Sequence, residues 1–202
     1  MERRLNFTLR RSPQHPARIV ERNAMNLVLE FKDWIINEDT KKYSCVMAVF
    51  DNPQLFISRT KKHVAEKDVF EEEGIEEESH ATALYGLHTN DYKVVEDHIK
   101  GFKPFDISLG KVSKFDTHPN YDVLKVEVKG DQLFKLNKLL RQLPYTSKYD
   151  KYIPHCTLAY VHKGTCEDLI GNDYFIDKKI KVKELTFSSN VRKKTKIKLG
   201  QA

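Results

Sequence analysis

The chain has 202 residues, of which 40% are hydrophobic and 32% charged, and it carries a formal net charge of +6. This length and composition predict one soluble domain with a hydrophobic core of its own. No stretch approaches the roughly 20 consecutive apolar residues of a membrane-spanning helix, and the beginning of the sequence lacks the apolar block of a secretory signal. The three cysteines form no Cys-x-x-Cys pair, so free thiols and a cytoplasmic protein are expected.

The positive charge is concentrated at the start of the sequence, where residues 1–24 hold six arginines and only two glutamates. Two prolines and the lack of any helical or strand period predict that this segment is a basic, disordered leader. The folded domain is therefore expected over residues 25–202, beginning with a short helix at about 26–37. An acidic run at 71–78 and a basic run at 192–198 are interpreted as solvated surface.

The first part of this domain contains two apolar runs of strand length, YSCVMAVF (43–50) and HATALYGL (80–87). The acidic segment between them, 51–79, is predicted to be a long connection that crosses near a site. After the second run, a helix capped at 90–91 is expected to continue to about residue 102.

The second part of the domain repeats this alternation of strands and helices. Alternating apolar residues predict strands at 105–115 and 121–129, and a helix that Asp131 caps and Pro144 ends. The run HCTLAYVH (155–162) is predicted to be another strand, before a short helix near 166–170. Two further strands are expected within IKVKELTFS (180–188) and KTKIKL (194–199). These elements predict an α+β fold.

Two of the strand-like runs share the pattern H-x-T-x-x-Y, in HATALY (80–85) and HCTLAY (155–160). With eight histidines in the chain, roughly one H-x-[ST] match is expected by chance. Both copies open a strand and both carry tyrosine at the same offset, so we interpret them as an internal repeat.

Alternate residues of a strand point to the same side, so each motif presents an imidazole beside a hydroxyl. The pairs are His80 with Thr82 and His155 with Thr157. A single histidine would be interpreted as a polar residue of a structural core. The matched pair favours a catalytic site, because two buried imidazoles beside hydroxyls would otherwise cost desolvation without a use.

Strand parity also makes a prediction about the other motif residues. Tyr85 and Tyr160 are expected on the opposite face, as core residues. Cys156 is expected to point away from the site as well, which argues against a catalytic cysteine.

Two histidines and two threonines supply what phosphodiester cleavage requires. One imidazole accepts the proton of the attacking oxygen, the other protonates the leaving oxygen, and the hydroxyls donate to the non-bridging oxygens. The remaining histidines show no metal-ligand spacing such as H-E-x-x-H. We therefore expect a site without a metal or a cofactor.

The runs HATALYGL and PHCTLAYV resemble the two signature strands of the two-histidine (2H) phosphoesterase superfamily, and the resemblance spans roughly residues 41–198. It implies a bilobed fold, with two pseudo-symmetric halves whose antiparallel sheets surround a central cleft and whose helices lie outside. It also implies the catalytic roles given above for His80, Thr82, His155 and Thr157.

A finer resemblance links GIEEESHATALYGLH (74–88) and ELTFSS (184–189) to the phage anti-CBASS phosphodiesterases, which destroy cyclic di- and trinucleotide immune signals. This resemblance implies a viral immune-evasion enzyme of the host cytoplasm that acts as a monomer without a stable protein partner. It further implies substrate-binding roles for Tyr43 and Glu184, with Phe115 as a stacking residue. From the sequence alone, the same three residues also fit a strand edge, an exposed surface position and the core, respectively.

Two other functions fit the same residues. The protein could act on 2′,3′-cyclic or 2′,5′ linkages of RNA or nucleotides, or it could sequester nucleotides or RNA without cleaving them, with its basic segments providing affinity. The pattern leaves open which histidine is the acid and whether water or a ribose 2′-hydroxyl attacks.

Overall fold

The chain divides into two units, Met1–Asp39 and Thr40–Ala202. The computed structural model describes residues 43–147, 149, 151–176 and 178–200, all of them in the second unit. The predicted leader at 1–24 and the predicted helix at about 26–37 both lie outside the described residues.

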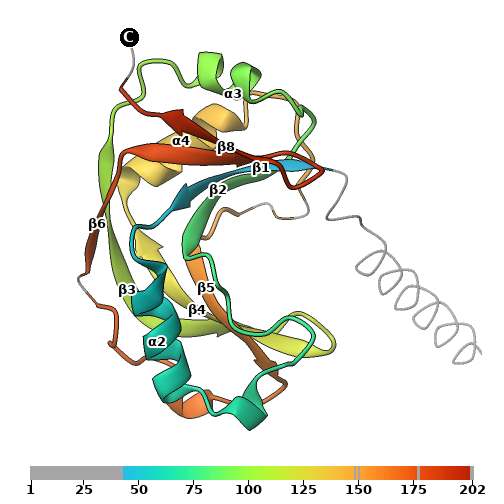
Figure 1. The fold of residues 1–202 in the computed structure, drawn as a ribbon, viewed down its shortest axis with the longest axis vertical. Helices are drawn as coiled ribbons and strands as arrows, with labels where there is room; N and C mark the ends of the chain where they lie inside the picture. The colour runs from blue at the N-terminus through green and yellow to red at the C-terminus, as the bar shows by residue number, and fades with distance from the viewer. Residues whose placement is uncertain (1–42, 148, 150, 177, 201–202) are drawn as a thin grey trace, which may run out of the picture. The chain divides into compact units, whose positions relative to one another are not determined.

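Eight strands and three α-helices make up the described part of the chain (Figure 1). In order they are β1 (Ser44–Val49), α2 (Pro53–His63), the 3₁₀ turn η1 (Glu66–Asp68), β2 (His80–Leu87), α3 (Tyr92–His98), β3 (Phe105–Phe115), β4 (Tyr121–Lys129), α4 (Asp131–Leu140), β5 (His155–His162), the 3₁₀ turn η2 (Glu167–Leu169), β6 (Lys179–Val182), β7 (Glu184–Ser188) and β8 (Lys194–Lys198). The predictions for β2, β3, β4 and β5 are confirmed with the same bounds.

The strands form two antiparallel four-stranded sheets, with the orders β2-β1-β7-β8 and β5-β4-β3-β6. The predicted α+β class is confirmed. Each sheet contains two adjacent strands that are joined by a helix, β1-α2-β2 in the first sheet and β4-α4-β5 in the second. In both units the second strand begins with the H-x-T motif. Strands β7 and β8 complete the first sheet, so the two halves of the fold are not the two halves of the sequence.

Three expectations about helices are corrected. The connection predicted at 51–79 contains α2, which was missed because Phe56 and Thr60 are its only buried residues and give little helical pattern. Helix α3 ends at His98, before the predicted residue 102. Helix α4 ends at Leu140, and Gly130 is its N-cap, so Asp131 is its first residue instead.

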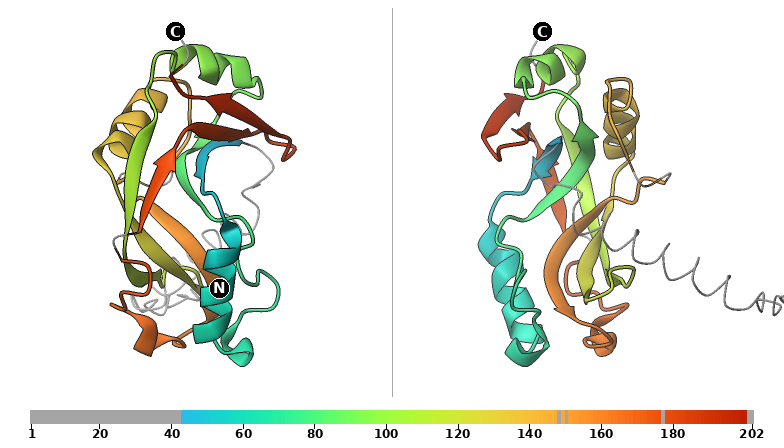
Figure 2. Two further views of the ribbon diagram at one scale, coloured as in Figure 1. Left: turned by 60° about the vertical axis from the view of Figure 1, so that its left-hand side comes forward. Right: turned by 90° about the vertical axis from the view of Figure 1, so that its right-hand side faces the viewer.

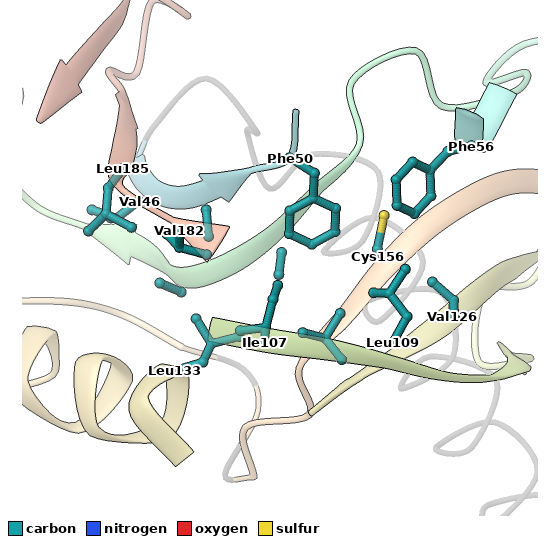
Figure 3. Packing of buried hydrophobic residues seen from close by; sticks show 14 of the residues in the cluster. Val46, Phe50, Phe56, Ile107, Leu109, Val126, Leu133, Cys156, Val182 and Leu185 are labelled. Carbon is teal, nitrogen blue, oxygen red and sulfur yellow. The ribbon is translucent and has the colours of Figure 1, made fainter. Parts of the chain in front are cut away.

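The core is one cluster of apolar side chains from both sheets and from the helices (Figure 3). Strand β1 supplies Val46, β3 supplies Ile107 and Leu109, and α4 supplies Leu133. Cys156 belongs to this cluster and has no exposed surface, as strand parity predicts. Burial raises the pKa of its thiol to about 12, so it is not a thiolate at neutral pH.

Candidate functional site

The two H-x-T motifs lie close together because β2 and β5, the outer strands of the two sheets, contact one another (Figures 1 and 2). The backbone of His80 lies near enough to the Cys156 thiol to lower its pKa, although burial raises that pKa more. The fold therefore unites residues that are far apart in the sequence.

The segment before β2 crosses over and covers the outer edge of β5. The amide of Phe70 donates to the carbonyl of Tyr160 at 2.9 Å, and the amide of Tyr160 donates to the carbonyl of Gly74 at 2.9 Å. The amide of Glu76 donates to the carbonyl of Leu158 at 3.0 Å. The acidic connection thus runs along β5, and its backbone protects an otherwise open sheet edge.

The segment before β5 makes the reciprocal crossing and covers β2. The amide of Thr146 donates to the carbonyl of Gly86 at 2.9 Å, and the hydroxyl of Tyr152 donates to the carbonyl of Thr82 at 2.9 Å. Gly86 has a φ of +96°, and a Cβ there would lie 1.9 Å from the carbonyl oxygen of Thr146, so only glycine permits this approach. Each motif strand is thus held by the segment that leads into the other.

Both histidines are oriented by the same hydrogen bond. Nδ1 of His80 lies 2.6 Å from the carbonyl oxygen of Glu78, and Nδ1 of His155 lies 2.7 Å from that of Ile153. A carbonyl oxygen only accepts, so Nδ1 carries the hydrogen in both rings. This leaves Nε2 of each imidazole for proton transfer, and in each case the acceptor is the residue two positions before the histidine.

Each threonine shares a sheet face with its histidine. In the first sheet, His80 lies opposite Val49 and Thr82 opposite Met47. In the second sheet, Glu127 lies opposite His155, and Lys125 lies opposite the threonine. All four motif side chains are partly exposed, so they form an accessible polar surface.

The prediction for the two tyrosines is wrong, because each motif strand contains a β-bulge. Thr82 lies opposite Met47 of β1, and Tyr85 lies opposite Cys45, two residues earlier in the same strand. Thr82 and Tyr85 therefore face the same side of the sheet, although they are three residues apart in β2. The matching bulge in β5 puts Tyr160 on the face of its own histidine and threonine. Tyr85 is 40% exposed, and Tyr160 is half-buried, with burial raising its pKa to about 12. Both tyrosines therefore extend the site face and do not belong to the core.

His155 lies beside an aromatic ring. The ring of Phe115 meets it edge-on, with 4.9 Å between the ring centroids. Burial lowers the pKa of His155, Lys125 and His80 lower it further by their charge, and the hydrogen bond to Ile153 partly opposes them. This imidazole is therefore biased toward its neutral form.

The structure places the three predicted substrate-binding residues at different distances from the motifs. Phe115 contacts His155 directly. Tyr43 stacks on His88, beyond the end of β2, with 5.3 Å between the ring centroids. Glu184 begins β7 and forms an ion pair with Lys196, on the sheet face that also carries Thr186 and Met47.

Lys125 was missed by sequence reasoning, because one lysine in an alternating strand gives no signal. Only its position opposite Thr157 reveals its proximity to the site. Within the described ranges, no group of three histidine, cysteine or acidic side chains is placed to hold a metal ion. None of the described helices is long and apolar enough to cross a membrane.

A family model described as the 2′-5′ RNA ligase superfamily matches residues 77–193, a segment that contains both motifs. The chain belongs to this superfamily, that of the two-histidine phosphoesterases. No curated protein sequence matches the chain.

Several solved structures share the fold. TT0787 of Thermus thermophilus is 13% identical, with a TM-score of 0.58 over 79% of this chain and 98% of that one. Escherichia coli LigT complexed with 3′-AMP is 12% identical, with a TM-score of 0.55 over 73% and 88%. Kluyveromyces marxianus Usb1 with uridine monophosphate is 10% identical, with a TM-score of 0.53 over 79% and 99%. At these identities the likeness concerns the fold.

Proposed function

We propose that the protein is a metal-independent phosphodiesterase in which His80 and His155 act as paired general acid and base. The observation that carries this proposal is the matched pair of Nδ1 hydrogen bonds, which leave Nε2 of each imidazole for proton transfer. Histidine exchanges protons near neutral pH, so one neutral and one protonated imidazole can coexist there.

The reaction requires that one proton is removed from the nucleophile and that one proton is donated to the leaving oxygen. The neutral imidazole takes the proton from the attacking hydroxyl or water as the new O–P bond forms. The bond from phosphorus to the leaving oxygen breaks, and that oxygen receives the proton of the other imidazole. Thr82 and Thr157 donate hydrogen bonds to the non-bridging oxygens, where negative charge increases in the transition state.

For the substrate, we propose the 3′,5′ bonds of cyclic di- and trinucleotide immune messengers, which would make the protein a viral anti-CBASS enzyme. The resemblance of residues 74–88 and 184–189 to that group supports this specificity. The ring of Phe115 beside His155 offers a surface for a base, and Tyr43 and Glu184 are the other proposed base-binding residues.

A second candidate is cleavage of 2′,3′-cyclic or 2′,5′ linkages in RNA or nucleotides. The fold relatives favour it, because LigT was solved with 3′-AMP and Usb1 with uridine monophosphate. Both candidates use the same four motif residues, and they differ only in how the substrate is held.

A substrate panel in excess EDTA tests these proposals. The panel contains 3′,3′-cyclic GMP-AMP, a cyclic trinucleotide, 2′,5′-oligoadenylate and a 2′,3′-cyclic nucleotide. We expect wild type and the control His63→Ala to cleave the cyclic oligonucleotides, and His80→Ala/His155→Ala to cleave nothing. His63 is a suitable control because it stacks on Tyr174, at the end of α2.

Cleavage of another member of the panel would keep the mechanism and change the substrate. Loss of activity in EDTA, restored by a divalent metal ion, would contradict the metal-free reaction. Binding of a nucleotide without any cleavage would favour the sequestering function.

A further inference from the structure

The two halves of the site differ at the position opposite each threonine. Met47 lies directly opposite Thr82 in the first sheet, and Lys125 lies directly opposite Thr157 in the second. Both side chains are buried, at 6% and 5% exposed. The pseudo-symmetric site therefore has a neutral thioether on one side and a cation on the other.

We propose that Lys125 is a positioning residue that makes the two histidines unequal, so that His155 is the general base and His80 the general acid. This inference rests on the proposed phosphodiesterase function and assigns the two proton-transfer roles within it.

Burial lowers the pKa of Lys125, and the charge of Glu127 partly opposes this. The direct contacts of the ammonium group favour its charged form. Its Nζ donates to Oγ of Ser113 at 2.7 Å and lies 4.2 Å from the ring centroid of Phe115. A hydroxyl oxygen and the face of an aromatic ring both favour an ammonium group. No carboxylate in the described part of the chain lies within ion-pair distance of this Nζ.

The same aromatic ring connects the cation to the imidazole. Phe115 covers the ammonium with its face and meets His155 edge-on, with 4.9 Å between the ring centroids. The positive charge is thus separated from the imidazole by little more than one ring. A buried cation at this range disfavours a second positive charge on His155.

The other charged groups around His155 do not cancel this effect. Glu127 lies opposite His155 on β4, but its side chain is 49% exposed and its carboxylate lies 4.0 Å from Lys129. His80, from β2, is a second cation whenever it is protonated, and it also disfavours charge on His155.

Around His80 the arrangement differs. Its cross-strand partner is Val49, and the nearby Glu78 carboxylate is paired with Lys194 on β8. The uncharged Met47 occupies the position equivalent to Lys125. His155 therefore starts the reaction neutral and accepts the proton of the nucleophile, and His80 supplies the proton that the leaving oxygen takes.

An activated substrate tests the assignment of roles. Uridine 3′-(4-nitrophenyl phosphate) offers a 2′-hydroxyl nucleophile, and its nitrophenolate leaves without needing a proton. We expect His80→Ala to lose about 10²–10⁴-fold on an unactivated substrate, yet to stay within about tenfold of wild type on this one. His155→Ala should lose activity on both. The assignment would be overturned if the activated substrate restored the activity of His155→Ala, or if it restored the activity of neither variant.

The part played by Lys125 is tested by NMR titration of the His155 ring, which needs no turnover. We expect Lys125→Met to raise the pKa of His155 and to move the acid limb of kcat/KM to higher pH. Lys125→Arg should keep the pKa of His155 and the acid limb of kcat/KM near those of wild type. The matched control is Lys179→Met, an exposed lysine of β6 at the opposite edge of the same sheet, which should change neither.

An unchanged His155 titration in a Lys125→Met protein that unfolds at the wild-type temperature would overturn the proposal. An equal change in Lys179→Met would also overturn it. If wild type cleaves no substrate but Lys125→Met still moves the titration, the proposed function fails and the electrostatic effect of Lys125 remains.

Discussion

The hydroxyl of Tyr152 donates a hydrogen bond to the backbone carbonyl of Thr82, at 2.9 Å, and so joins the approach to the second motif to the centre of the first. Burial raises the pKa of this phenol, which therefore stays protonated and able to donate at neutral pH. The segment that carries Tyr152 thereby fixes β2 from outside its sheet.

Tyr152→Phe removes this bond and leaves the carbonyl of Thr82 without its donor. We expect the free energy of unfolding to fall by about 1 kcal/mol, measured by urea denaturation. Tyr149→Phe is the matched control, because Tyr149 is 74% exposed. Equal stability of the two variants would mean that the bond contributes nothing.

Gly86→Ala tests the crossing at the end of β2. The added Cβ would lie 1.9 Å from the carbonyl oxygen of Thr146, so the segment before β5 must move away. We expect a loss of about 3 kcal/mol or more in the free energy of unfolding. In Gly164→Ala the φ is similarly positive, at +76°, but nothing lies within 4 Å, and a loss of only about 1–2 kcal/mol is expected. Comparable losses would show that φ strain, not the crossing, sets the cost.

Thr82→Val and Thr157→Val remove the two hydroxyl donors and preserve side-chain shape. We expect each to lower kcat by about 10²-fold, because donors to the developing charge act mainly in the transition state. Thr117→Val, in the exposed turn between β3 and β4, should leave kcat unchanged. A rise in KM alone, with kcat intact, would indicate that the hydroxyls only bind the ground state.

The lowered pKa of the Asp122 carboxyl predicts how the stability of the protein depends on pH. Burial raises the pKa of this carboxyl, but Lys163, the amide of Gly164 and Lys114 outweigh it and lower the pKa from 3.8 to about 2. A depressed carboxyl pKa means that the folded state holds the proton less tightly than the unfolded state does. The stabilisation is present above the unfolded pKa and is lost as the pH falls toward about 2.

Thermal unfolding between pH 7 and pH 2 measures this effect. We expect the wild-type midpoint to fall steeply at the acid end, and Asp122→Asn to be less stable at pH 7 but to lose less on acidification. Asp116→Asn, which changes an exposed carboxyl, should follow wild type. Parallel acid profiles for wild type and Asp122→Asn would contradict the assignment.

The strands and the two H-x-T motifs could be predicted from local patterns in the sequence. Short apolar runs with sharp polar boundaries indicated the bounds of β2 and β5, because strand periodicity is a local property of neighbouring residues. The repeated H-x-T pattern identified His80 and His155 for the same reason, since side chains two apart on a strand share a face.

Contacts between strands decide which residues face the site. The bulges that turn Tyr85 and Tyr160 onto the motif face are set by register with the neighbouring strands, and parity along one strand cannot reveal them. Helix α2 was hidden because it buries few side chains. Lys125 lies opposite Thr157 only because β4 pairs with β5, and hydrogen bonds between strands join residues that the sequence keeps apart.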